Sequence, residues 1–171
     1  MFLSFLTIVH VIISLAGIVA GLVVLRGLLL GQSLDRWTAL FLSTTVLTSV
    51  TGFFFPTTHV MPSQIVGGLS LLVLALVIYA RYSRHLEGAW RKVYVVGAVL
   101  ALYLNVFVAV VQAFLKTPAL KALAPTQTEL PFKATQLAVL VLFIALGAVA
   151  TIRFRGNAAS KISLAQQISE S

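Results

Sequence analysis

The sequence contains no cysteine. The chain therefore has no disulfide, no thiolate metal ligand and no thiol nucleophile, and cysteine usage says nothing about its redox compartment. It also lacks a glycine-rich phosphate loop, a His-Glu-x-x-His pair and a serine nucleophile elbow. These absences exclude several enzyme classes, and we expect no catalytic residue.

Charged residues are scarce, at 9% of the chain, whereas a soluble domain has about 25%. Hydrophobic residues make up 60%. A soluble domain of roughly 150 residues buries about 70% of its chain surface and still needs a polar shell, which this composition does not supply. The alternative solvent is lipid, where backbone groups must pair within helices or a closed barrel. Because the apolar runs are too long for barrel strands, the sequence predicts an all-α polytopic membrane protein.

The apolar runs predict a bundle of five transmembrane helices, since about 20 apolar residues cross the hydrocarbon core. The predicted spans lie near residues 2–30, 37–55, 64–82, 93–115 and 134–152. They form a single bundle over residues 1–155, and residues 156–171 form a short polar tail.

The second span is the least apolar of the five. Its hydroxyl side chains can bond back to their own helix, so it still counts as a span. They are Ser43, Thr44, Thr45, Thr48, Ser49 and Thr51. Before this span, Ser33 and Asp35 are candidate N-caps. The long connection before the last span is expected to hold a short surface helix around residues 119–123.

Lysine and arginine are unevenly divided between the two predicted sides of the membrane. One side carries nine: Arg26, Arg36, Arg81, Arg84, Arg91, Lys92, Arg153, Arg155 and Lys161. The other carries three: Lys116, Lys121 and Lys133. The positive-inside rule makes the first side cytoplasmic, so the N-terminus faces outward and the C-terminal tail is cytoplasmic. Despite the formal charge of +8, the basic residues mark helix ends and form no nucleic-acid-binding stripe.

Three polar residues are predicted on the outer side: His10 inside the first span, and His59 and Glu129 in outer loops. Imidazole pairs bind haem iron, and imidazole with carboxylate suits a transition metal, so His10 and His59 are candidate cofactor ligands with Glu129 as a third metal ligand. The alternative is that His10 is a helix-packing residue and His59 a solvated loop residue. His85 lies on the opposite side.

The His10 side of the first span carries small and polar residues at alternating steps of three and four: Thr7, His10, Ser14, Gly17 and Gly21. This face is expected to pack against protein, because small residues let helices approach closely.

A second small-residue seam follows the fourth span at every fourth position: Gly97, Ala101, Asn105, Ala109 and Ala113. Gln112 lies close to the same face. The seam predicts close helix packing, either self-association or contact with another membrane protein. Asn105 and Gln112 alternatively belong to a small-molecule pocket.

Several segments resemble a family of small, uncharacterised bacterial polytopic inner-membrane proteins. They are Trp90-Arg-Lys-Val-Tyr, Leu102-Tyr-Leu-Asn-Val-Phe-Val, Val111-Gln-Ala-Phe-Leu-Lys-Thr-Pro-Ala-Leu and Ala124-Pro-Thr-Gln-Thr-Glu-Leu-Pro-Phe. The Phe53-Phe-Phe-Pro turn and the Pro62-Ser-Gln start of the third span are similar too. The resemblance covers most of residues 50–135. It implies a bacterial plasma-membrane location and brings no assigned activity.

Three functions remain open. The first is a non-enzymatic accessory protein that binds another membrane component. The second is a haem or metal protein for electron transfer or sensing, using His10 and His59. The third is a small channel or carrier, which requires an oligomer because five helices leave little room for a pathway.

Overall fold

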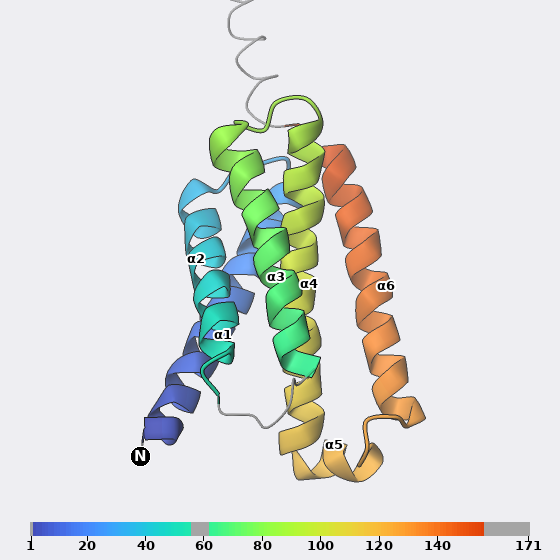
Figure 1. The fold of residues 1–171 in the computed structure, drawn as a ribbon. Coiled ribbons are helices and arrows are strands. Elements are labelled where there is room, and N and C mark those ends of the chain that lie inside the picture. The colour runs from blue at the N-terminus through green and yellow to red at the C-terminus, as the bar shows by residue number, and fades with distance from the viewer. Residues whose placement is uncertain (1, 56–61, 156–171) are drawn as a thin grey trace, which may run out of the picture.

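The computed structural model describes residues 2–55 and 62–155. Five long helices run up and down beside one another, and one short helix lies across an end of the bundle (Figure 1). The long helices are α1 (Phe2–Leu29), α2 (Asp35–Gly52), α3 (Pro62–Ile78), α4 (Ala89–Lys116) and α6 (Leu130–Arg153). The short helix α5 (Pro118–Leu123) confirms the surface helix expected in the long connection. No strand occurs in these two ranges, so the all-α prediction is confirmed for them.

Four helices are long and apolar enough to cross a membrane: α1, α3 with the turn that follows it, α4 and α6. They agree with four of the five predicted spans, and the chain is a multi-pass membrane protein by this measure. The second predicted span is helical as α2, but its hydroxyl residues and the Asp35-Arg36 pair lower its hydropathy. The fifth crossing therefore stays a prediction. The predicted tail at 156–171 lies outside the described residues.

Helix α4 lies at the centre of the bundle, and its buried residues include Tyr94, Ala98, Ala101 and Leu102. These residues belong to a hydrophobic core that also includes residues of α1, α2, α3 and α6. Around this core the outward faces of the long helices are apolar, as a helix surrounded by lipid requires.

Two glycines let helices cross closely. A Cβ on Gly21 of α1 would lie 2.5 Å from Leu102 Cδ1 and 2.9 Å from the Phe41 ring. A Cβ on Gly97 of α4 would lie 2.5 Å from Val77 Cγ2. The predicted packing face of α1 is therefore in contact with α2 and α4.

The turn after α1 contains a glycine with a backbone conformation that few other residues adopt. Gly31 has φ +71°, the N–H of Gln32 donates to the carbonyl of Gly27, and the N–H of Gly31 donates to that of Leu28. This pattern satisfies the last carbonyls of the helix. It turns the chain into α2 within a few residues.

The start of α2 differs from the prediction. Leu34 occupies the N-cap position, and no side chain caps the helix. Ser33 donates instead to the Asp35 carboxylate, so neither predicted residue serves as the cap. Asp35 already belongs to the first turn of the helix, where its carboxylate meets a cation from the turn that follows α3.

Candidate functional site

Two polar clusters lie inside the bundle, near its opposite ends. The first surrounds Arg81, which lies in the π-helical turn η1 (Tyr79–Ser83) at the end of α3. A π-turn inserts one extra residue into the helix and often marks a functional site. Here it places the Arg81 side chain between α2 and α4.

Arg81 is held by a carboxylate and two rings. Its Nη2 donates to Asp35 Oδ1, and its guanidinium carbon lies 5.2 Å from the Tyr94 ring centroid and 5.7 Å from that of Tyr82. The Arg81 side chain is 9% exposed, whereas that of Asp35 is 78% exposed. A nearly buried cation is thus neutralised by a carboxylate that still reaches solvent.

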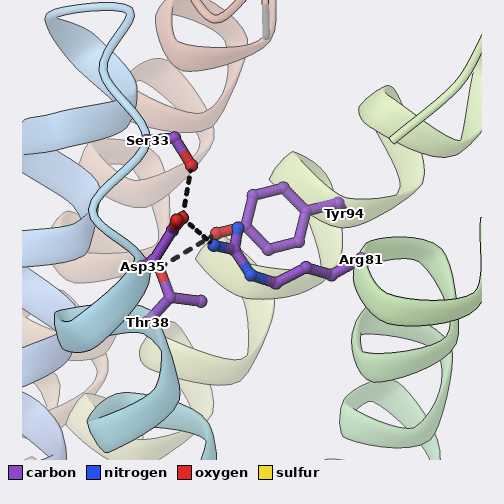
Figure 2. Close-up of polar contacts among 5 residues, drawn as sticks. All are labelled: Ser33, Asp35, Thr38, Arg81 and Tyr94. Atoms are coloured by element: carbon purple, nitrogen blue, oxygen red, sulfur yellow. Dashed lines mark hydrogen bonds and ion pairs between the residues drawn. The ribbon is translucent and has the colours of Figure 1, made fainter. Parts of the chain in front are cut away.

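Figure 2 shows how two further residues, Ser33 and Thr38, join this group. We call the group the Arg81 cluster: Ser33, Asp35, Thr38, Arg81 and Tyr94. Ser33 Oγ donates to Asp35 Oδ1 at 3.0 Å, and the Thr38 and Tyr94 hydroxyls lie 3.4 Å apart. The cluster connects the α1–α2 turn to α2, η1 and α4. It holds one ion pair and no paired acid and base, so its geometry suits anchoring rather than proton transfer.

The second cluster, at the other end of the bundle, centres on His10 of α1. His10 Nδ1 lies 2.8 Å from Thr51 Oγ1 of α2. Thr51 Oγ1 also lies 2.7 Å from the carbonyl oxygen of Leu47, to which it donates. Because a hydroxyl has one proton, Thr51 accepts from His10, and Nδ1 carries the histidine proton. His10 Nε2 then keeps its lone pair.

The rest of this cluster fixes the His10 backbone and ring. Ser14 Oγ donates to the His10 carbonyl at 2.7 Å, and the ring meets Phe55 edge-on with centroids 5.3 Å apart. The structure therefore supports the packing interpretation of His10. The structure also leaves His10 Nε2 with a lone pair of the kind that binds metals, on a ring oriented by the hydrogen bond from Nδ1.

The other proposed ligands are not brought to His10. His59 lies outside the described residues. Glu129 bonds locally, accepting from the Thr126 hydroxyl at 2.8 Å and from the Thr128 N–H at 3.0 Å. The hydrogen bond from Thr126 holds the pKa of the Glu129 carboxyl below its usual value. Over residues 2–55 and 62–155, no three histidine, aspartate or glutamate side chains gather as a metal site.

The small-residue seam of α4 is used within the chain along part of its length. Gly97 lies against Val77 of α3, Ala101 is fully buried, and Asn105 Nδ2 donates to Thr45 Oγ1 of α2 at 3.1 Å. Ala109 and Ala113 are half-buried, and Gln112 is exposed. Asn105 thus serves helix packing, and Gln112 does not share its contact.

Two features had no counterpart in the sequence reasoning. The Arg81–Asp35 pair was missed because Arg81 was treated only as a topology signal, although Asp35 is one of just four acidic residues. Gln136 was missed in α6, where its Nε2 donates to the Phe107 carbonyl at 3.2 Å and its Oε1 is buried without a partner in the described part of the chain. A lone amide within an apolar span was the available signal.

Comparisons with protein-family models, with curated proteins and with solved structures find no match to this chain. The resemblance to small bacterial inner-membrane proteins consequently stays a prediction.

Proposed function

We propose that this chain is a non-enzymatic accessory protein of the membrane, which binds another membrane component through the outer faces of its helices. The observation that supports this function is that polar side chains of the bundle bond to one another. His10, Asn105 and Arg81 are each bonded to a side chain of α2. Between its two ends, the bundle presents mainly apolar side chains to its surroundings.

Helix α6 is the face best suited to a partner. Within the apolar stretch of α6, only 17% is buried inside the chain, whereas the corresponding share is 28% or more in each of the other three candidate spans. Its exposed large residues include Leu137, Val141, Ile144 and Ile152. Helix α6 packs mainly on α4, and α1 is its other main neighbour (Figure 1).

Photo-crosslinking in intact membranes tests this role. A benzophenone amino acid at Val141 of α6 should give one discrete adduct, either a dimer or a complex with a second protein. The same probe at Leu72, an equally apolar exposed position on α3, is the matched control and should give none. If neither position gives an adduct above the lipid background, the accessory role is contradicted.

We further propose that α2 is the fifth span. Its 18 residues cover about 27 Å at 1.5 Å per residue, close to the roughly 30 Å of the hydrocarbon core. Its hydroxyls bond to carbonyls one turn earlier, as Ser43 does to Ala39 and Thr44 to Leu40. Such back-bonded hydroxyls remove the main cost of placing them in lipid.

With five spans, the two ends of the bundle face opposite compartments. The end that holds η1 and the ends of α1 and α6 is rich in arginine, and we place it in the cytoplasm of a bacterial cell on the positive-inside rule. The N-terminus is then outside and the C-terminus inside.

A haem or transition-metal protein is the second candidate, and the lone pair assigned to His10 Nε2 favours it. If it is correct, the protein purified in detergent has bound metal or a Soret band, and His10→Ala and His59→Ala each abolish it. His85→Ala, at the opposite end, is the control and leaves the signal unchanged. A colourless, metal-free preparation contradicts this candidate.

A further inference from the structure

A groove of about 440 Å³ opens where the C-terminal ends of α1 and α6 meet. It is lined by Leu29, Leu30, Gly31, Ile152, Arg153 and Arg155. One part of the lining is cationic, whereas Leu30 and Ile152 are apolar and exposed at 57% and 76%. The groove therefore combines positive charge with an apolar wall at the end of two membrane-crossing helices.

The backbone around this groove is held firmly. A Cβ on Gly31 would lie 3.3 Å from the Arg153 carbonyl oxygen, so the turn after α1 is packed against the end of α6. Arg91 Nη1 of α4 donates to the Arg155 carbonyl at 2.9 Å. These contacts fix where the two arginines leave the backbone.

The arginine side chains at the groove are largely unused by the rest of the chain. Within the described residues, the Arg153 side chain makes one hydrogen bond, to the Leu29 carbonyl at 3.5 Å, which is the limit for such a bond. The Arg155 guanidinium has no hydrogen-bond or ion-pair partner in the ranges the structure describes, and neither has that of Arg26. The Arg81–Asp35 pair is the sole ion pair within those ranges.

Arg26 belongs to the same surface because it lies one turn before Leu30 on the same face of α1. Leu22, another turn earlier on this face, is exposed, and so is Val149, one turn before Ile152 on α6. Apolar surface thus continues from the groove along both helices toward the middle of the membrane.

We propose that this groove binds the headgroup of an anionic phospholipid. Its phosphodiester lies between the guanidinium groups of Arg26, Arg153 and Arg155, and its acyl chains follow the exposed apolar residues of α1 and α6. Basic pockets between membrane helices are the usual sites for anionic headgroups. A soluble phosphate has the same negative charge but no acyl chain to contact the apolar wall. We therefore assign a lipid.

This inference rests on the proposed membrane role and deepens it by naming a lipid as one bound component. The two fail separately. If the parent chain shows no lipid selectivity but α6 still crosslinks, only the lipid site is overturned. If the parent chain is lipid-selective but α6 gives no adduct, only the partner role is overturned.

Native mass spectrometry of the full chain, titrated with phosphatidylglycerol or phosphatidylcholine of equal chain length, tests the site. Phosphatidylglycerol should bind more tightly. The double variant Arg26→Gln/Arg155→Gln should weaken its binding roughly 30-fold, since each interfacial arginine contributes about 1 kcal/mol. Neither side chain has a hydrogen-bond or ion-pair partner among residues 2–55 and 62–155, so folding should not change. The matched control Lys116→Gln/Lys133→Gln removes the same charge at the opposite end and should bind as the parent does.

A second variant keeps all three arginines. Ile152→Trp fills the groove with an indole and should also weaken phosphatidylglycerol binding, which separates a defined site from diffuse charge. Equal binding of the two lipids, or equal losses in both double variants, overturns the proposal. Full competition by glycerol phosphate, which has no acyl chains, overturns it in favour of a soluble anion.

Discussion

At the scale of single residues, Arg81 combines a positive charge with near-complete burial. It is nearly buried, and its guanidinium meets one carboxylate and two aromatic rings, while Asp35 stays mostly in solvent. The cost of desolvation therefore falls on the arginine, whose contacts offset it. Removing the cation and removing the carboxylate should have unequal effects.

Arg81→Ala should lower the free energy of unfolding by about 1 to 3 kcal/mol, because it removes a charge-assisted hydrogen bond and the cation–π contacts. Asp35→Asn should cost less, since an amide oxygen still accepts from Arg81. Thermal unfolding in detergent measures both. Lys92→Ala, exposed at the same end, is the control and should be neutral. A larger loss in Asp35→Asn than in Arg81→Ala contradicts this ranking.

The tautomer of His10 is a second residue-scale prediction. The Thr51 hydroxyl donates to its own helix and so accepts from Nδ1, which makes Nδ1–H the neutral form. Nitrogen-15 NMR of histidine-labelled protein should report this tautomer for His10. Thr51→Val should shift His10 toward the Nε2–H form, while exposed His85 stays unchanged. A His10 that is already Nε2–H in the parent disproves the assignment.

Glu129 gives a pH-dependent prediction. Hydrogen bonds from Thr126 and Thr128 lower the pKa of this carboxyl from 4.5, so they stabilise the folded chain when Glu129 is ionised. That contribution is complete above the ordinary pKa and is lost as the pH falls through the lowered one. Melting temperatures of the parent and Glu129→Gln should therefore differ near neutral pH and converge in acid. A difference that grows in acid opposes this sign.

At the scale of whole helices, apolar run length was enough to predict α1, α3, α4 and α6. Their ends differ from the predicted spans by a few residues, because polar residues at the interface continue the helix where hydropathy has already fallen. Trp90 and Arg91 illustrate this, since both belong to α4 although the predicted span begins at residue 93.

The sequence did not predict the π-turn at η1 or the contacts that depend on it. Nothing local to residues 79–83 indicates a widened turn, and the partners of Arg81 within it lie on α2 and α4, far away in the sequence. The Asn105–Thr45 contact is similar, because each residue was recognised as polar but their pairing depends on how α2 and α4 pack. Pairings between helices are a property of tertiary structure, which hydropathy does not encode.

The helix crossing at Gly21 leads to a prediction with a matched control. Gly21→Ala places a methyl group 2.5 Å from Leu102 Cδ1, and such overpacking typically costs 1 to 3 kcal/mol. Gly68→Ala has no heavy atom within 4 Å of the new Cβ and should be neutral or stabilise α3 slightly. Unfolding midpoints in one detergent compare the two. Equal midpoints show that the crossing is looser than these distances indicate.

At the scale of the whole molecule, the topology depends on whether α2 crosses the membrane. If it does, Gln32 in the α1–α2 turn and Ser83 at the end of η1 face the same compartment. If it does not, α3 is inverted relative to α1 and these residues face opposite compartments. Thr128, beyond α4, should lie opposite Ser83 in either case.

Single cysteines at Gln32, Ser83 and Thr128 distinguish these arrangements, because the parent has no cysteine to interfere. We expect an impermeant maleimide to label Thr128→Cys in intact cells. Gln32→Cys and Ser83→Cys should react only after permeabilisation. Labelling of Ser83→Cys but not Gln32→Cys in intact cells removes α2 from the spans.

Two turns at the arginine-rich end of the bundle are short. Only residues 30–34 connect α1 to α2, and residues 84–88 connect η1 to α4. Such turns present little surface to which a protein outside the membrane could bind. The proposed association would then take place sideways within the bilayer, between helix faces, at a rate set by lateral diffusion and by copies per unit area of membrane. Membrane fluidity and expression level would therefore govern association, and the volume concentration of soluble proteins would not.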